Sequence, residues 1–158
     1  MDYILSESDV EIRPMEYRDL SFFLETRNLV RHHLHDDREF TLEETKKWWK
    51  KTDIQYLIIE VRDTAVGYFR NQNLGNNKIM IGADIHPAYQ RKGIAYISYK
   101  ILLNKFISDN SEISIYLKVL RKNQKAFNLY KKLSFETVEV TEKDFLMKLN
   151  NQKFLFNK

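Results

Sequence analysis

The segment between residues 79 and 102 restricts the possible folds more than any other part of the sequence. It begins with an alternation in which every second residue is apolar: Ile79, Ile81, Ala83 and Ile85. This period of two predicts a β-strand with one buried face, and Pro87 ends it. After Gly93, apolar residues recur at the spacing of a helix: Ile94, Ile97, Ile101 and Leu102. A strand that leads through a tight turn into a helix predicts a layered fold in which sheet and helices share a core.

Further strands and helices follow along the rest of the chain. Apolar or alternating runs predict strands over residues 11–14, 56–61, 65–69, 113–119, 135–140 and 145–149. Helical spacing predicts helices over residues 19–27, 41–49 and from 123 onward. We therefore predict an α/β (α+β) fold with a mixed central β-sheet and helices on both faces, formed by a single domain over residues 1–158.

Local signals also mark the ends of these elements. Asp19 is expected to cap the first helix, and Thr41 with Glu44 has the spacing of a capping box at the start of the second. The asparagine-rich segment over residues 71–77 is expected to form a turn between two strands.

The composition excludes several classes of protein. Hydrophobic residues make up 43% of the chain and charged residues 30%, with only 4 Gly and 2 Pro, which excludes collagen-like and disordered chains. The chain has no cysteine, so disulfide scaffolds, cysteine-bound zinc, iron–sulfur clusters and thiol catalysis are excluded. No apolar run approaches the roughly 20 residues that span a bilayer. We therefore expect no leader or membrane segment and a cytoplasmic location.

Charge is distributed unevenly. The formal net charge is +4. Residues 1–44 carry five Lys or Arg against twelve Asp or Glu, a net of −7, and residues 45–158 carry 21 against 10, a net of +11. An acidic first segment and a basic remainder indicate one cationic and one anionic partner. No run of basic residues interleaved with aromatics forms a nucleic-acid-binding stripe, so nucleic acid is not an expected partner.

The turn between the strand that ends at Ile85 and the helix that begins after Gly93 has the chemistry of a phosphate-binding loop. Arg91 and Lys92 bring two positive charges to the start of a helix, where unpaired N–H groups already favour an anion. Gly93 leaves room for a phosphate to approach the backbone, and Ala95 keeps the next turn narrow. These residues favour a pyrophosphate site, and the alternative is an ordinary helix start at the surface.

Two motifs resemble those of the GCN5-related N-acetyltransferase (GNAT) superfamily. Residues 90–95, Gln-Arg-Lys-Gly-Ile-Ala, match its coenzyme A loop, Q/R-x-x-G-x-G/A, and residues 86–89, His-Pro-Ala-Tyr, match the preceding x-P-x-Y. Residues 119–135 resemble its pattern V-x-x-x-N-x-x-A-x-x-x-Y-x-K-x-G-F, with Ser134 in place of the glycine. The resemblance covers most of the chain and implies acetyl-CoA as cofactor and an N-acetyltransferase activity by direct attack in a ternary complex.

The resemblance also implies roles for individual residues. The strand that ends at Ile85 is expected to separate from its neighbour and to bind the pantetheine arm, with a backbone N–H near Ile85 acting on the thioester carbonyl. Tyr130 matches the tyrosine that protonates the departing thiolate. The expected cofactor-binding residues are Ile85, Gln90, Arg91, Lys92, Gly93, Ile94, Ala95, Asn123, Ala126 and Lys132. The alternative for Lys132 and its neighbour Lys131 is a solvated helix face.

The acceptor amine must lose a proton before it attacks, because its pKa is near 10. Family members often use a glutamate at a position that aligns near Met80, so this base is missing here. Asp84 and His86 lie on one face of the strand about 7 Å apart and are the candidate catalytic bases, with Asp84 the first choice. The alternative for Asp84 is to bind the acceptor's cation or a nearby backbone group.

The region after the first helix is expected to bind the acceptor. The candidate substrate-binding residues are Arg27, Asn28, His32, Trp48 and Tyr68. Trp48 can stack on a sugar or a base, and the alternative is core packing. We expect no metal site, because the adjacent His32 and His33 cannot face the same way on a helix.

The acceptor region is similar to acetyltransferases that act on amino-sugar nucleotides and to those that act on the N-termini of ribosomal proteins. An amino-sugar nucleotide is the first choice of small-molecule amine acceptor. A protein amine, a polyamine and an aminoglycoside are alternatives. A non-catalytic acyl-CoA sensor is the alternative from another class of protein. The chain is expected to be a monomer or a homodimer.

Overall fold

The computed structural model describes residues 5–157 of the chain. The strands are β1 Val10–Pro14, β2 Gln55–Val61, β3 Thr64–Gly75, β4 Lys78–Ile85, β5 Ser114–Leu120, β6 Phe135–Val140 and β7 Asp144–Leu149. The helices are α1 Leu20–Leu29, α2 Leu42–Trp49, α3 Ile94–Asp109, α4 Gln124–Lys132 and α5 Asn151–Phe156. Every predicted strand and helix is present, and α5 is an addition to them.

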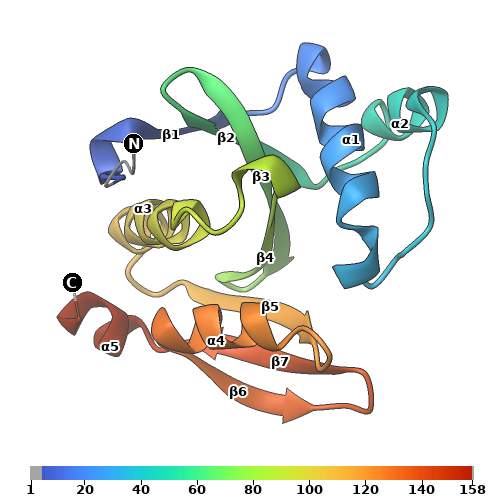
Figure 1. Cartoon of the computed structure of the whole chain (residues 1–158). Helices are drawn as coiled ribbons and strands as arrows, with labels where there is room; N and C mark the ends of the chain where they lie inside the picture. The colour runs from blue at the N-terminus through green and yellow to red at the C-terminus, as the bar shows by residue number, and fades with distance from the viewer. Residues whose placement is uncertain (1–4, 158) are drawn as a thin grey trace.

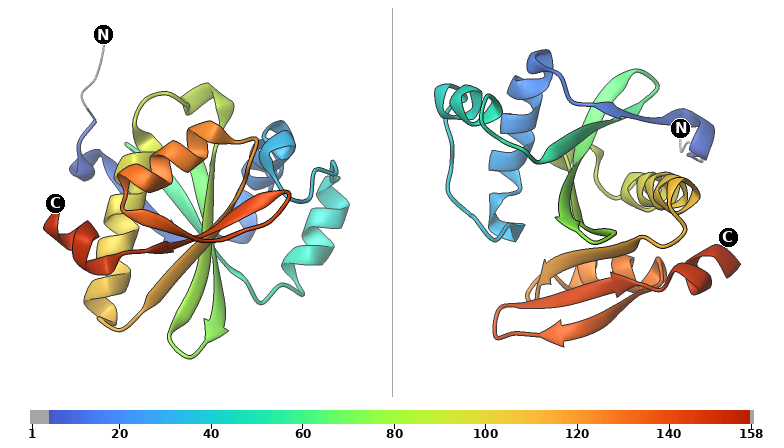
Figure 2. Two further views of the ribbon diagram at one scale, coloured as in Figure 1. Left: turned by 90° about the horizontal axis from the view of Figure 1, so that it is seen from below. Right: turned by 180° about the vertical axis from the view of Figure 1, so that it is seen from behind.

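The strands form one sheet in the order β1-β2-β3-β4-β5-β7-β6. Neighbouring strands are antiparallel except β4 and β5, which are parallel because α3 connects them across one face. α1 and α2 lie on one side of the sheet and α3 on the other (Figure 1), and the view from behind in Figure 2 agrees. The predicted mixed sheet with helices on both faces is confirmed.

Two clusters of buried side chains hold the helices on the sheet. The larger cluster joins α3, α4 and α5 to one face and includes Leu103, Ile115 and Met147, all with no exposed surface. The smaller cluster joins α1 and α2 to the other face through Phe23 and the strand residues Ile58 and Tyr68. β2 is buried on both sides, which explains its continuous apolar run.

β4 and β5 separate soon after they begin. Their pairing joins only residues 78–80 to residues 114–116, and no further pair links the two strands up to their ends at Ile85 and Leu120. β4 remains paired with β3 over its whole length. The edge of β4 that faces β5 is therefore open beyond Met80, as the family resemblance implies.

Two local expectations are wrong. β3 continues through Asn71 to Gly75, and the turn is confined to Asn76 and Asn77, whose φ angles of 53° and 60° asparagine tolerates better than most residues. Asp19 makes no side-chain cap on α1; its carboxylate instead accepts hydrogen bonds from Arg13 and from the Glu16 N–H. The capping box at the start of α2 is confirmed.

Within the described residues, no helix combines the length and the apolar character that crossing a membrane requires.

Candidate active site

The turn that leaves β4 exposes the backbone at the start of α3. Gly93 is the residue before the helix and has a φ of 78°, and Arg91 has a φ of 64°. No side chain caps the helix, and a Cβ added at Gly93 would meet nothing within 4 Å. The N–H groups of the first turn lack partners within the helix. This turn therefore has the donors and the open approach that a pyrophosphate requires.

Neighbouring side chains hold the turn in place. Gln90 donates from Nε2 to the Ile85 carbonyl oxygen at 2.9 Å, which fixes the end of β4 to the turn. Ile94 is 3% exposed and packs in the core, so only its backbone is available to a ligand. Of the predicted loop residues, Arg91, Lys92 and Gly93 are exposed, and Ala95 is half-buried.

The helix after β5 places Tyr130 inside the molecule. Asn123 caps α4 by accepting the Ala126 N–H at 3.3 Å, and Tyr130 follows at 8% exposure. The Tyr99 hydroxyl donates to the Tyr130 hydroxyl at 3.4 Å. Burial raises the pKa of Tyr130. The hydrogen bond from Tyr99 lowers this pKa and the charge of Asp84 raises it, and the net shift is upward. Tyr130 therefore keeps its proton, as a general acid must.

Asp84 lies on the other side of the sheet from α3, and Tyr68 holds its carboxylate. The two residues face each other in the β3–β4 register, and Tyr68 donates from its hydroxyl to Asp84 Oδ2 at 2.6 Å. Burial raises the pKa of Tyr68 well above its ordinary value, and the Asp84 charge raises it further. Tyr68 is therefore a permanent donor, and Asp84 is held in one orientation by it.

His86 has a different environment from Asp84. Its Nδ1 accepts the Ala88 N–H at 3.1 Å, and its Nε2 lies 3.2 Å from Glu25 Oε2. The ring also stacks on Phe22 of α1, with centroids 6.1 Å apart. The neutral ring is therefore the Nε2–H tautomer, and neither nitrogen has a free lone pair for an acceptor's proton. Of the two predicted bases, Asp84 is the one with the geometry for the role.

Asp84 opens into a cavity of about 540 Å³, which we call the acceptor cavity. Its lining residues are Phe23, Arg27, Leu34, His35, Asp36, Arg38, Phe40, Glu44, Thr45, Trp48, Tyr56, Tyr68, Arg70 and Asp84. Of the predicted substrate-binding residues, Arg27, Trp48 and Tyr68 are among them.

The other two predicted substrate-binding residues, Asn28 and His32, do not line the acceptor cavity. The Asn28 amide instead bonds the backbone of Phe40 in both directions, at 2.9 and 3.1 Å, and so shapes the loop between α1 and α2. His32 is exposed on the turn after α1.

Trp48 packs in the core and also lines the acceptor cavity. It stacks on Phe23 with centroids 5.2 Å apart and planes within 4°, so it belongs to the aromatic packing between α1 and α2. It also lines the acceptor cavity, where Phe40 and Tyr56 add two more aromatic rings. The cavity is therefore lined by several aromatic rings as well as by the carboxylate of Asp84.

Four charged residues that line the cavity were not among the predicted site residues: Asp36, Arg38, Glu44 and Arg70. Arg70 lies on the sheet itself, beside Asp84. It pairs with Gly82 in the β3–β4 register, and its guanidinium lies against that glycine, where a Cβ would be 2.5 Å from Nη2. Strand alternation from Tyr68 places Arg70 on the same face, so the sequence did contain a signal for it. Burial lowers the pKa of Arg70, but the charge of Asp84 raises it and the net shift is upward.

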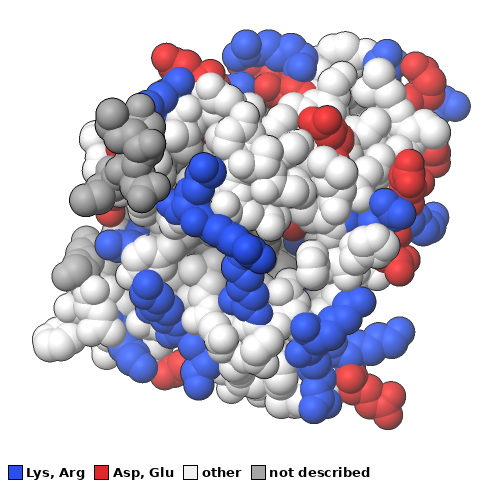
Figure 3. All heavy atoms as spheres, viewed as in Figure 1, with Lys and Arg blue, Asp and Glu red and all other residues white. Residues whose placement is uncertain are grey.

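Lysine side chains gather near the predicted cofactor end. Lys132 of α4 and Lys100 of α3 both lie over the Tyr96 ring, with Nζ 4.5 and 5.4 Å from its centroid. Figure 3 shows Lys and Arg side chains over the central and lower part of the face that carries α3 and α4. This basic surface lies on the side of the molecule that carries α3 (Figures 1 and 3).

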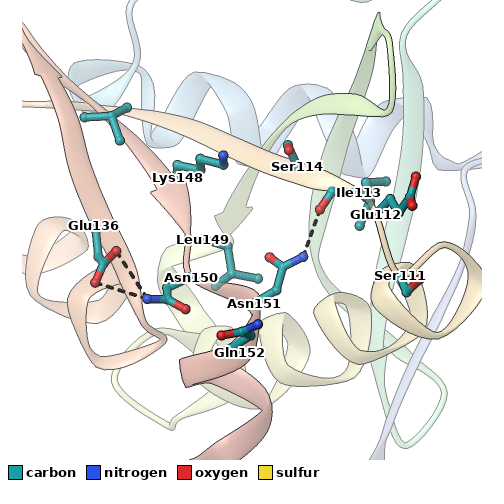
Figure 4. Close-up of a pocket in the computed structure, with 11 residues that line it drawn as sticks. Ser111, Glu112, Ile113, Ser114, Glu136, Lys148, Leu149, Asn150, Asn151 and Gln152 are labelled. Atoms are coloured by element: carbon teal, nitrogen blue, oxygen red, sulfur yellow. Dashed lines mark hydrogen bonds between the residues drawn. The ribbon is translucent and has the colours of Figure 1, made fainter.

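A second cavity, of about 380 Å³, lies beside the start of β5, β6, the end of β7 and the start of α5, and most of its lining residues are polar (Figure 4). Asn151 donates to the Ile113 carbonyl oxygen at 2.8 Å, and the Asn150 amide faces the Glu136 carboxylate. The side chains that line this cavity therefore attach the start of α5 to the rest of the fold. The second cavity lacks the aromatic rings of the acceptor cavity and lies at the opposite end of β5 from the open gap.

Several solved structures share the fold of this chain. Spermidine N-acetyltransferase from Vibrio cholerae, solved with CoA and spermine, has a TM-score of 0.82 at 20% identity, over 94% of this chain and 99% of that one. YncA from Salmonella typhimurium, solved with its cofactor acetyl-CoA, has a TM-score of 0.70 at 17% identity, over 89% and 93%. An N-acetyltransferase from Staphylococcus aureus has a TM-score of 0.73 at 14% identity, over 90% and 98%. At these identities the likeness establishes the fold.

The sequence itself carries the family assignment. No curated protein matches it significantly. The family model of the acetyltransferase (GNAT) family matches residues 17–135, which include the open strand, the turn at Gly93 and Tyr130. The expected fold, family and class of enzyme are confirmed: the chain belongs to the acetyltransferase (GNAT) family.

Proposed function

We propose that the protein is an acetyl-CoA-dependent N-acetyltransferase that acetylates the primary amine of a small polar acceptor by direct attack. The observation that carries this proposal is the position of Asp84. Its carboxylate lines the acceptor cavity, on the strand whose opposite edge is open toward β5. The chain has no cysteine to form a thioester of its own, which supports direct transfer.

The residues present fit the cofactor. The exposed backbone of residues 91–95 suits the pyrophosphate, and the open edge of β4 up to Ile85 suits the pantetheine arm. Asn123 and Ala126 lie at the start of α4, and Lys132 at its end suits a 3′-phosphate. When bound, acetyl-CoA supplies the acetyl group as an activated thioester.

The chain's own residues move the protons. Asp84 accepts the proton of the acceptor's ammonium group at its carboxylate, which the Tyr68 hydroxyl orients from 2.6 Å. Tyr130 holds a proton at its Oη for a departing thiolate, since burial raises its pKa. The charge of Asp84 acts on Tyr130, so the base and the acid influence each other.

Thiol release with a panel of primary amines tests this function. Wild-type protein should release thiol with at least one amine, and Tyr130→Phe should lower kcat by about 100-fold or more with an unchanged Kd for acetyl-CoA. Asp84→Asn should lower kcat similarly. Tyr17→Phe, at an exposed tyrosine, is the matched control and should leave both values unchanged. Acetyl-CoA binding without thiol release for any amine would instead identify an acyl-CoA sensor.

Two acceptor classes have specific support. The Vibrio cholerae enzyme is a spermidine N-acetyltransferase, which supports a polyamine. The cavity itself carries Arg27, Arg38 and Arg70 beside the carboxylates of Asp36, Glu44 and Asp84, so its charge alone does not select a polycation. The aromatic rings of the cavity favour the amino-sugar nucleotide expected from the sequence. A protein amine as the acceptor and a cytoplasmic location of the enzyme remain predictions from the sequence.

A further inference from the structure

Arg70 differs from the other arginines of the acceptor cavity in having no hydrogen bond or ion pair among the described residues. Arg38 binds both carboxylate oxygens of Asp36, at 2.9 and 2.8 Å. Arg27 donates to the backbone carbonyls of Asp36 and Arg38 and lies 4.3 Å from the Phe40 ring centroid. Within residues 5–157, the Arg70 guanidinium has neither a hydrogen bond nor an ion pair within 4 Å.

The fold nevertheless makes room for this guanidinium. Gly82 faces Arg70 across the β3–β4 pair, and any side chain there would occupy the space that the guanidinium takes. Protein atoms surround it on the side of the sheet, while its remaining surface stays exposed to the open cavity. A planar group with five N–H donors thus faces a cavity with its donors unused.

Arg70 and Asp84 are diagonal neighbours on one face of the β3–β4 pair, and their opposite charges interact. Asp84 lies two residues from Gly82 on β4, about 7 Å along the strand. Asp84 already accepts the Tyr68 hydroxyl, and the charge of Arg70 acts on the same tyrosine. An acceptor with only positive charges would bring one of them against Arg70. A compact acceptor with an amine and an anionic group matches both residues.

We infer that the acceptor carries a carboxylate or a phosphate group, and that Arg70 binds this group while Asp84 receives the amine. This inference rests on the proposed function and narrows its substrate class. Guanidinium groups bind carboxylate and phosphate in the same two-point geometry, so the two sources share one chemistry. Arg70 is then the residue that determines specificity.

Matched amine pairs test the inference. One pair is phenylalanine and 2-phenylethylamine, and the other is glucosamine 6-phosphate and glucosamine; the first arm tests a carboxylate and the second a phosphate. In the pair that carries the preferred anion, carboxylate or phosphate, the wild-type kcat/KM should be at least tenfold higher for the anionic amine than for the neutral one. Arg70→Gln should raise its KM at least tenfold and leave the KM of the neutral member unchanged. The comparison with wild type cancels differences in amine basicity.

Two further variants support this test. Arg70→Lys keeps the charge without the two-point geometry and should recover part of the preference. Arg18→Gln, at an exposed arginine paired with Glu16, is the control for loss of a positive charge. The inference is overturned if spermidine or both neutral amines are the better substrates, or if Arg70→Gln slows both members of each pair equally, as a mere counter-charge for Asp84 would.

A binding measurement separates this inference from the proposed function. If no amine releases thiol, the function fails, but calorimetric titration of glucosamine 6-phosphate and of N-acetylphenylalanine in the presence of CoA still tests Arg70. Wild-type protein should bind one of them, and Arg70→Gln should lose at least tenfold in affinity. Absence of binding, or equal binding by both proteins, overturns the inference.

Discussion

Two glycines on adjacent strands show how the surroundings of a single residue decide what a substitution does. A Cβ at Gly82 would lie 2.5 Å from Arg70 Nη2, which is the far end of a flexible side chain. A Cβ at Gly67 would lie 2.5 Å from the backbone oxygen of Asp84 and 2.8 Å from Ile85 Cδ1, within the sheet. The same added methyl group therefore has two different consequences.

We predict that Gly82→Ala displaces Arg70 and leaves the fold intact. Its melting temperature should stay close to that of wild type, while the KM for an anionic acceptor rises. Gly67→Ala should lower the free energy of unfolding by about 1–3 kcal/mol, because backbone must move to relieve the overlap. Urea unfolding and acceptor kinetics on both variants check this. Equal loss of stability in the two would contradict the difference between a side-chain and a backbone obstacle.

At the scale of elements, an ion pair joins β1 to the start of α1. Arg13 donates to both oxygens of Asp19, at 2.8 and 2.9 Å, and also to Glu60 of β2 at 3.1 Å. Burial acts to raise the pKa of Asp19, but the bonds from Arg13 and from the Glu16 N–H outweigh it and the net shift is downward. The charged carboxylate is therefore part of the folded structure.

This downward shift predicts a loss of stability in acid. Unfolded Asp19 has an ordinary pKa of 3.8, so the stabilisation is complete above that pH and is lost as the pH falls through the lower folded value. Asp19→Asn should cost about 3 kcal/mol at pH 7, since it leaves Arg13 without its main partner. Below pH 4 its stability should fall less steeply than that of wild type.

Urea unfolding from pH 7 to pH 3 measures both effects. Asp63→Asn, at an exposed turn residue whose φ of 68° asparagine also tolerates, is the control. Parallel pH curves for Asp19→Asn and wild type would show that Asp19 does not cause the acid sensitivity.

At the scale of the whole molecule, one contact ties the loop after α1 to the C-terminal strands. His35 Nε2 lies 2.8 Å from Asp144 Oδ2, although the residues are 109 positions apart. The same loop supplies Leu34, Asp36 and Phe40 to the acceptor cavity. The contact therefore connects a wall of that cavity to β7.

We predict that His35→Ala raises the KM for the acceptor about fivefold or less and leaves the Kd for acetyl-CoA unchanged. The limit follows from the exposure of the pair, since such pairs contribute at most about 1 kcal/mol. His33→Ala is the matched control on the same loop, because His33 is exposed and does not line the cavity. A double-mutant cycle with Asp144→Ala should show the coupling. Additive effects would mean that the contact does not hold the loop.

Predictions from the sequence succeeded where a feature depends on neighbours along the chain. The alternation over residues 79–85, the capping box at Thr41 and the turn at Gly93 each follow from a local pattern and are present in the structure. The predicted end of β3 is wrong, because pairing with β2 and β4 extends that strand through asparagines that favour turns in isolation.

The sequence by itself determined the mixed fold, the family and the position of the open turn at Gly93, because these depend on periodicity and on motifs of adjacent residues. Only the tertiary structure decided which polar groups share the acceptor cavity. Strand register brings Arg70 to Gly82 and Tyr68 to Asp84. Packing of α1 brings Glu25 to the His86 ring, which occupies Nε2 of that histidine. Register and helix packing depend on contacts between distant residues, which local patterns do not contain.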